Sequence, residues 1–193
     1  VQRLVEASEG GALVLCTSQR MVQVFERSLV DGDYHCLVQG RAPRNQLLRT
    51  FRQSGRAVLI ATMSFWRGVD VPGPALRLVI MDKVPFASPV EPMVRGRLDY
   101  LRAKGSDPFR TWQLPQAALM MRQGFGRLIR STRDRGVVAI LDPRMATRGY
   151  RFYLKKNLPE CRQLKRLDET LSELATLERG STLLEELRQK APA

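Results

Sequence analysis

The sequence predicts an α/β fold in which helices sandwich a parallel sheet. Five short segments are apolar at nearly every position, and stretches with the apolar spacing of helices separate most of them. A continuous apolar strand is typical of a sheet buried on both faces, and parallel strands need long, usually helical, connections. The chain has 193 residues, of which 44% are hydrophobic, so it can build one substantial core. We therefore expect one α/β domain with a helical appendage.

The first three strands are expected over residues 12–17, 34–39 and 58–61. Ser18 is a candidate N-cap for a helix after the first strand, and Pro43 stands where a helix after the second strand begins. The apolar face of the first helix contains Met21, Val22, Val24, Phe25 and Leu29. The apolar face of the next contains Leu47, Leu48 and Phe51. Two strand–helix–strand units in succession predict parallel pairing.

The last two strands are expected over residues 78–81 and 137–141. The insert between them, residues 87–115, contains a helix with an apolar side and an arginine side. The apolar side carries Val94, Leu98 and Leu101, and the other carries Arg95, Arg97 and Arg102. The arginine side is either a solvated surface or a contact with a nucleic-acid backbone. A further helix through residues 150–154 can return to the sheet after Pro143.

Residues 161–193 differ in character from residues 1–160, which we expect to form the α/β domain. Four leucines recur at intervals of three and four, as in a helix with a narrow apolar stripe: Leu164, Leu167, Leu171 and Leu174. After an interruption at Gly180, Thr182 and Glu185 form a capping box for a last helix. The stripe either packs against its own domain or binds a partner protein.

Lys and Arg outnumber Asp and Glu by 32 to 19, which leaves a net charge of +13. This charge favours nucleic acid or an anionic membrane surface as a partner. No apolar run approaches the roughly 20 residues that span a bilayer, and the chain opens without a signal-peptide pattern. The three cysteines lack the spacing of a zinc site. We expect a cytoplasmic protein with reduced, buried thiols and, because the first residue is Val, a part of a longer chain.

Gln123, Arg127 and Arg130 follow one another at spacings of four and three, so a continuous helix would place them on one face. Guanidinium groups bind phosphate oxygens bidentately. Two of them on a rigid element suit the charge that develops in phosphoryl transfer. A solvated basic helix face is the other interpretation of the same spacing.

Three strings resemble motifs of one family. Residues 123–136, QGFGRLIRSTRDRG, followed by a strand and LDPR, resemble motif VI of the DinG/XPD-like DNA helicases of superfamily 2. Residues 61–73, ATMSFWRGVDVPG, resemble motif V of that family, and residues 79–86, VIMDKVPF, resemble the stretch that follows it. The strings occur in the family's order, and the resemblance covers residues 12–158. It implies a RecA-like fold, that of the second helicase domain.

The resemblance implies roles in ATP hydrolysis. Gln123, Arg127 and Arg130 are expected to approach the phosphates of ATP across a cleft between two RecA-like domains, with Arg130 as an arginine finger. Gly68 of motif V allows a close backbone approach, and Asp70 offers acceptors to a ribose hydroxyl or a neighbouring motif. The chain contains no Gly-x-x-x-x-Gly-Lys-Ser/Thr string and no Asp-Glu-x-His box. ATP and Mg²⁺ are therefore expected to be held mainly by the other domain, which also carries the family's iron–sulfur cysteines, and this chain alone is expected to be inactive.

The resemblance also implies DNA contacts, which fall on Thr17, Ser18, Arg20, Gln39, Gly40, Thr62 and Arg67. Ligands of parallel sheets bind at the carboxyl ends of the strands, so we expect these turns and motifs V and VI to share one working edge. Arg67 departs from the family, which commonly has Glu there. Phe65 and Trp66 are either core residues or stack on a base.

The expected function is that of the second motor domain of an ATP-dependent helicase, which translocates 5′ to 3′ on single-stranded or forked DNA in repair or replication. The expected partners are the first RecA-like domain of the same chain and a replication protein, such as the polymerase III χ subunit or single-strand-binding protein. Two alternatives stay open: a recruitment module that docks a replication protein through residues 160–193, and an RNA helicase. The Phe65–Trp66 pair and residues 82–86 favour the DNA branch over the RNA branch.

Overall fold

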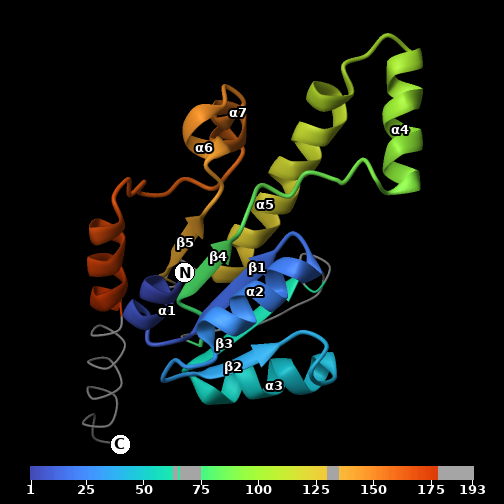
Figure 1. The fold of residues 1–193 in the computed structure, drawn as a ribbon. Coiled ribbons are helices and arrows are strands. Elements are labelled where there is room, and N and C mark those ends of the chain that lie inside the picture. The colour runs from blue at the N-terminus through green and yellow to red at the C-terminus, as the bar shows by residue number, and fades with distance from the viewer. Residues whose placement is uncertain (63–64, 66–74, 130–134, 178–193) are drawn as a thin grey trace, which may run out of the picture.

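A computed structural model describes residues 1–62, 65, 75–129 and 135–177 of the chain. Its centre is a sheet of five strands in the order β2-β3-β1-β4-β5, with helices on both faces (Figure 1). The strands are β1 (Ala12–Cys16), β2 (His35–Val38), β3 (Ala57–Thr62), β4 (Leu78–Met81) and β5 (Val137–Ile140). Every pair of neighbouring strands is parallel, which confirms the α/β prediction.

The central strands are buried on both faces. All residues of β1 and β4 are buried, and so are all residues of β3 except Thr62. Successive side chains of a strand point to opposite faces, so Leu13 belongs to one core and Val14 to the other. The edge strand β5 is less covered, because only Val137 is fully buried. Burial on both faces explains the continuous apolar runs in the sequence.

Three helices cover one face of the sheet. They are α3 (Arg44–Ser54), α5 (Leu114–Leu128) and α7 (Arg151–Lys156). Their buried side chains form one core with alternate residues of the strands. The core contains Phe51 of α3, Met121 of α5 and Leu154 of α7, each at most 1% exposed.

The opposite face is covered by α1 (Gln2–Ala7), α2 (Gln19–Leu29) and a helix over residues 167–177. Leu174 of this last helix is 1% exposed and belongs to the core of this face, with Leu171 packed beside it. Leu167, at the start of the helix, is 44% exposed. The described part of the C-terminal appendage therefore packs against the domain that precedes it.

The segment between β4 and α5 stands beyond the carboxyl ends of the strands. It contains α4 (Pro92–Ala103) and a π-helical turn over Phe109–Gln113 that leads directly into α5. Figure 1 shows α4 projecting from the rest of the molecule. The short helix α6 (Arg144–Thr147) follows β5 beyond the same edge. Among the described helices, none is long and apolar enough to cross a membrane.

Several helices differ from the sequence predictions. Val24 is 45% exposed, because it falls outside the arc that α2 turns toward the sheet. The helix α5 ends at Leu128 and Ile129 is extended, whereas Arg130 lies outside the described residues. The helix expected through residues 150–154 is α7, and a short helix that was not predicted, α6, precedes it. The helix expected from Leu164 begins at residue 167.

The described cysteines are unpaired thiols. Cys16 is buried and Cys36 is half-buried, whereas Cys161 is exposed in the stretch that follows α7. The prediction of buried thiols is therefore wrong for Cys161. Burial, and after it the charge of Asp82, raises the pKa of Cys16 to about 12, so this thiol stays protonated at neutral pH.

Candidate functional site

Polar side chains gather at the carboxyl ends of the strands. In the order of the sheet, the strands end at Gln39, Thr62, Thr17, Asp82 and Asp142. Each residue ends its strand or follows it by one or two positions, so the parallel order brings all five to one edge. Three of them were predicted DNA contacts, and the structure places these three on neighbouring strands.

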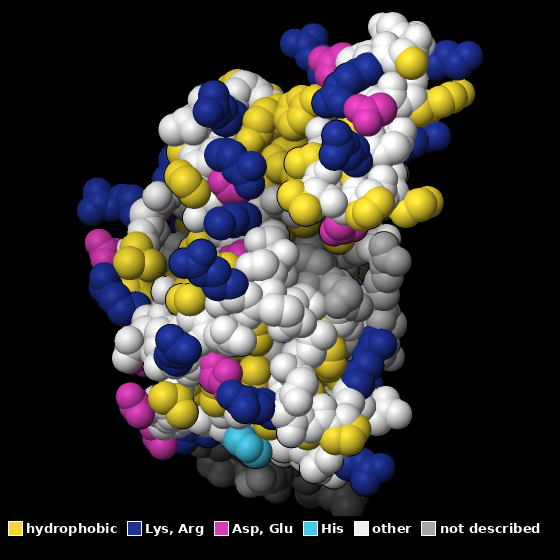
Figure 2. Space-filling view, turned by 45° about the vertical axis from the view of Figure 1, so that its right-hand side comes forward, with side chains coloured by type: hydrophobic (Ala, Val, Ile, Leu, Met, Phe, Trp, Pro, Cys, Tyr) yellow, Lys and Arg dark blue, Asp and Glu magenta, His cyan; other side chains and the backbone are white. Residues whose placement is uncertain are grey.

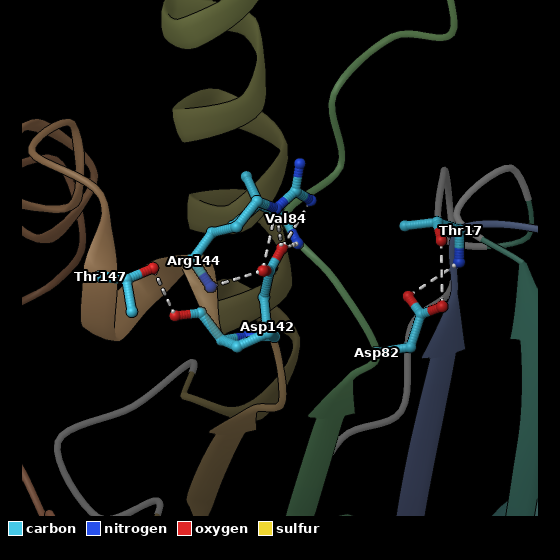
Figure 3. Close-up of polar contacts among 7 residues, drawn as sticks. Thr17, Asp82, Val84, Asp142, Arg144 and Thr147 are labelled. Carbon is cyan, nitrogen blue, oxygen red and sulfur yellow. Dashed lines mark hydrogen bonds and ion pairs between the residues drawn. The ribbon is translucent and has the colours of Figure 1, made fainter.

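Thr17 is bound to Asp82 across β1 and β4 (Figure 3). The Thr17 amide donates to Asp82 Oδ1 at 2.9 Å, and the Thr17 hydroxyl donates to Oδ2 at 3.0 Å. Burial raises the pKa of Asp82, and the hydrogen bonds from Thr17 and the charge of Lys83 oppose that rise only in part. Sequence reasoning assigned Thr17 to DNA and missed this bond. Asp82 therefore holds the turn that presents Thr17 and Ser18 at the edge.

Gln39 and Thr62 hold each other on neighbouring strands. Gln39 Oε1 accepts hydrogen bonds from the Thr62 amide at 2.7 Å and from the Thr62 hydroxyl at 3.0 Å. Gly40 follows with φ 92°, a conformation that favours glycine, and a Cβ at this position would meet no atom within 4 Å. The backbone of the turn after β2 is thus exposed, and the backbone of another molecule can approach it closely.

Ser18 and Arg20 begin the next element of the same edge. The Ser18 hydroxyl accepts from the Met21 amide at 3.3 Å, which confirms the predicted N-cap of α2. Ser18 and Arg20 are both exposed. Since α2 runs back from the end of β1, its amino terminus lies at the carboxyl edge, where the helix dipole favours an anion. This turn is suited to phosphate.

Asp142 is a buried acid whose partners the sequence did not reveal. Its carboxylate accepts from the amides of Val84 and Arg144, at 2.8 and 2.9 Å, and from the Arg144 guanidinium at 2.6 Å (Figure 3). Burial alone would raise the pKa of Asp142, but the hydrogen bonds from Arg144 and Val84 outweigh it and hold the pKa below the ordinary 3.8. The ionised carboxylate therefore ties the strand that leaves β4 to the start of α6.

Arg144 extends this contact into an aromatic cluster. Its guanidinium lies 5.2 Å from the centre of the Phe86 ring, and the rings of Phe86, Phe109 and Tyr150 lie 5.4 to 5.5 Å apart. The three rings come from the segment after β4, the π-helical turn before α5, and the start of α7. The cluster therefore connects the segments before and after α4 with the start of α7.

Asp142→Asn is expected to lower the free energy of unfolding at pH 7 by about 2–3 kcal/mol, because either orientation of the amide turns an NH₂ group toward a donor. The folded-state pKa of Asp142 is lowered, so its ionised form stabilises the fold above the unfolded pKa, and this stability is lost as pH falls through the folded pKa. The difference between the two proteins should therefore shrink below pH 3.8. Urea denaturation at pH 7 and in acid measures it.

Asp99→Asn is the matched control for this experiment. Asp99 also pairs with an arginine, Arg102, at 2.7 Å, but its side chain is 58% exposed. Its replacement should leave the urea midpoint nearly unchanged at both pH values. A difference between wild type and Asp142→Asn that stays constant from pH 7 into acid would contradict the pKa assignment.

Gln123 and Arg127 lie on α5, the former exposed and the latter half-buried. A Cβ on Gly136 would lie 2.6 Å from Leu128 and 2.7 Å from the Arg77 carbonyl, which places the end of α5 near the residue that precedes β4. The expectation of a single working edge is therefore wrong for this motif. A crossover helix must run back along the sheet, so the end of α5 lies toward the amino ends of the strands.

Phe65 of motif V and Leu76, which follows the motif, belong to the same core as α5. Phe65 and Leu76 are 6% and 4% exposed, and they share the core of this face with Phe125 and Leu128. Phe65 is thus a core residue, and its ring also lies 5.2 Å from the guanidinium of Arg44. The remaining predicted residues of these motifs lie outside the described residues: Trp66, Arg67, Gly68, Asp70 and Arg130.

Arg77 is a buried arginine that sequence reasoning did not single out. It is 8% exposed, and its guanidinium donates to the backbone carbonyls of Ser8, Glu9 and Gly55. Its own carbonyl accepts from the Val137 amide at 2.9 Å. Arg77 therefore connects the end of the motif V segment with the strand that follows motif VI. In the sequence, Arg77 is a single arginine before an apolar strand, and this pattern did not predict its buried contacts.

The chemistry of the described residues suits phosphate groups. Hydroxyl, amide and guanidinium donors lie at the carboxyl edge and on α5, and each can bind a phosphate oxygen. Among the same residues, no group of three or more His, Cys, Asp or Glu side chains could hold a metal ion.

Residues 1–161 match the family model described as the helicase C-terminal domain. The chain belongs to this family. The chain is 41% identical over 169 residues to the ATP-dependent DNA helicase YoaA of Haemophilus influenzae. This match covers 87% of the chain and 26% of that protein. The chain is 36% identical over 181 residues to the ATP-dependent helicase DinG of Mycobacterium tuberculosis, covering 93% of the chain and 27% of that protein. The chain thus spans about a quarter of the length of these relatives.

Among solved structures, Xpd4 of S. tokodaii aligns with a TM-score of 0.58 and 19% identity, over 82% of the chain and 31% of that structure. This likeness confirms that the helicase C-terminal domain has a RecA-like α/β fold. The family match and the two relatives confirm the resemblance found in the sequence: the chain is a C-terminal domain of a DinG/XPD-like helicase.

Proposed function

We propose that this chain is the second motor domain of an ATP-dependent DNA helicase and that it brings residues of α5 to ATP and residues of the carboxyl edge to DNA. The observation that carries the proposal is the family match over residues 1–161, joined to an α5 that leaves Gln123 exposed and Arg127 half-buried. The relatives YoaA and DinG are named ATP-dependent helicases.

On the nucleotide side, the core anchors α5 through Met121, Phe125 and Leu128. In the proposal this rigid element presents Gln123 and Arg127 to the phosphates of an ATP that the first RecA-like domain holds. Both side chains are donors that fit phosphate oxygens.

Arg130 follows the end of the helix and acts as the arginine finger. Water attacks the γ-phosphorus, the bond to the β–γ bridging oxygen breaks, and the guanidinium stabilises the charge on the transferring group. Gly68 and Asp70 of motif V complete this surface. Mg²⁺ is held mainly by the first domain, because this chain contains no Gly-x-x-x-x-Gly-Lys-Ser/Thr string and no Asp-Glu-x-His box.

On the DNA side, the carboxyl edge contacts the backbone of a single strand. The turn after β1 offers Thr17, Ser18 and Arg20, the turn after β2 offers Gln39 and Gly40, and β3 ends at Thr62. Arg67 adds a further cation from motif V. Since the edge and α5 belong to one domain, drawing the domain toward ATP also moves the bound strand. Repeated closure and release then carries the strand 5′ to 3′ and separates a duplex ahead.

The recruitment alternative has less support in the structure. The apolar stripe that was to bind a partner protein buries Leu174 fully and Leu171 in part against its own domain. Of the four leucines of this stripe, Leu167 is the exposed one, and Leu164 is half-buried. A helicase role for the whole chain requires no such surface.

The test of the proposal uses the full-length protein with forked substrates. We expect ATP hydrolysis that single-stranded DNA stimulates, and strand separation from a 5′ tail that exceeds separation from a 3′ tail or of an RNA duplex with the same sequence. Absence of DNA-stimulated hydrolysis would contradict the helicase proposal. Separation from the 3′ tail alone would contradict the polarity, and preference for the RNA duplex would support the RNA alternative.

A further inference from the structure

The outer flank of α4 carries an exposed stripe of aromatic, apolar and cationic side chains. Met93, Arg97, Tyr100 and Lys104 follow at spacings of four, three and four, so they lie in one row along the helix. Met93 is 86% exposed and Tyr100 is 53% exposed. The helix buries different residues, Val94 and Leu98, on its inner side. Met93 therefore contributes little to the packing of α4, and more than half of Tyr100 is open to solvent.

Two cations flank the Tyr100 ring. The Arg97 guanidinium lies 5.7 Å from the ring centre, and the Lys104 ammonium lies 6.0 Å from it. Within Pro92–Ala103 the acidic residue is Asp99, which pairs with Arg102 at 2.7 Å rather than with the row. The row is thus uniformly cationic around an aromatic ring that solvent reaches. Figure 2 shows Lys and Arg side chains interspersed with hydrophobic ones over the part of the molecule where α4 stands.

We propose that this row, which we call the α4 stripe (Met93, Arg97, Tyr100 and Lys104), is a binding site for single-stranded nucleic acid that stacks a base on Tyr100. Every base has a face that can stack on an aromatic ring, and cations on either side meet the flanking phosphates. A duplex hides its base faces, so the stripe selects an unpaired strand. The inference rests on the proposed function and adds a site that lies apart from the strand-end turns.

The position of α4 supports a nucleic acid over a protein partner. The insert leaves the sheet at the end of β4, which is the edge that carries Thr17 and Ser18, and α4 projects beyond that edge (Figure 1). A strand bound along the edge can therefore continue onto the stripe. The net charge of +13 also favours a polyanion as the occupant.

The first experiment compares Tyr100→Ala with Tyr100→Phe in the full-length protein. Fluorescence anisotropy with a labelled oligothymidine should show affinity reduced by about 5- to 150-fold for Tyr100→Ala and restored to within about twofold for Tyr100→Phe, because stacking needs the ring and not the hydroxyl. The DNA concentration that half-activates ATP hydrolysis should rise by the same factor in Tyr100→Ala. Unchanged affinity in Tyr100→Ala would overturn the inference, and so would a Tyr100→Phe variant as weak as Tyr100→Ala.

The second experiment removes charge. The double variant Arg97→Ala, Lys104→Ala should reduce the slope of log affinity against log salt by about 1.4, since each contact with a single strand contributes roughly 0.7. The control Arg3→Ala, Arg166→Ala removes the same charge from two exposed arginines beside Asp168 and should leave the slope unchanged. An equal reduction in the control would overturn the inference, because net charge alone would explain it.

The outcomes separate this inference from the proposed function. Normal DNA-stimulated hydrolysis with unchanged DNA affinity in Tyr100→Ala would refute the stripe and leave the helicase role intact. A Tyr100→Ala variant that loses a bound protein partner but keeps its DNA affinity would identify the stripe as a protein interface. Failure of the unmodified protein to bind single-stranded DNA would refute both.

Discussion

Arg130→Ala is expected to lower the turnover number of DNA-stimulated ATP hydrolysis by about 10³- to 10⁵-fold in the full-length helicase, the range found for arginine fingers in other phosphotransferases. The guanidinium is expected to meet charge that develops only in the transition state, so its loss should lower turnover more than ATP affinity. Arg130→Lys should recover little, because an ammonium lacks the planar fork that binds two oxygens. Steady-state release of phosphate at saturating DNA measures the effect.

Arg135→Ala is the matched control for Arg130→Ala. Arg135 belongs to the same connection between α5 and β5 and is exposed. Its loss should leave turnover within about threefold of wild type, as for most exposed side chains away from the chemistry. Single-strand affinity should persist in Arg130→Ala, because the proposed DNA contacts lie at the carboxyl edge. Full turnover in Arg130→Ala would remove the finger from the mechanism, and an equal loss in Arg135→Ala would assign the effect to the connection as a whole.

Arg77→Ala is expected to lower the free energy of unfolding by about 3–5 kcal/mol, the largest stability effect we predict for a single side chain, because it leaves buried carbonyls without their donor. Arg77 is 8% exposed, and its guanidinium donates to Ser8 at 2.9 Å and to Gly55 at 3.1 Å. Alanine would remove these donors from carbonyls that belong to the ends of α1 and α3. Urea denaturation followed by circular dichroism gives the free energy.

Arg56→Ala is the control for Arg77→Ala. Arg56 is next to Gly55 but 56% exposed, and it pairs with the fully exposed Asp33 at 3.4 Å. Its replacement should barely move the urea midpoint. Gly136→Ala is an independent test of the same region. A Cβ there would lie 2.7 Å from the Arg77 carbonyl, so this variant should also be less stable. Equal midpoints for Arg77→Ala and Arg56→Ala would contradict the buried role of Arg77.

The predictions made from local patterns agree with the structure where the pattern lies within one element. The N-cap at Ser18 and the helix that begins after Pro43 are confirmed, because capping and helix initiation depend on residues a few positions apart. The prediction for Val24 failed for a tertiary reason, since which arc of α2 is buried depends on how the helix sits on the sheet. The shared helical face of Gln123 and Arg130 stays a prediction, because α5 is described to Leu128 and Arg130 lies outside the described residues.

The roles of the candidate site residues stay predictions, and the structure shows only where the described ones lie. Thr17, Gln39 and Thr62 do reach one edge, as parallel strands require. Their partners could not be read from the sequence, because Thr17 bonds to Asp82 and Gln39 bonds to Thr62 only when those strands are placed side by side. Gln123 and Arg127 were expected at the same edge, but the crossover carries the end of α5 toward the amino ends of the strands.

The sequence by itself determined the strands, most of the helices and the helicase family, because apolar runs, helical periods and motif strings are properties of adjacent residues. Only the tertiary structure decided which of those elements meet. Asp142 binds Val84 from 58 positions away, Thr17 binds Asp82 across 65, and Arg77 reaches Ser8 across 69. Such contacts depend on the strand order β2-β3-β1-β4-β5 and on the direction of each crossover, and these are set by the packing of the whole core rather than by any single stretch of the chain.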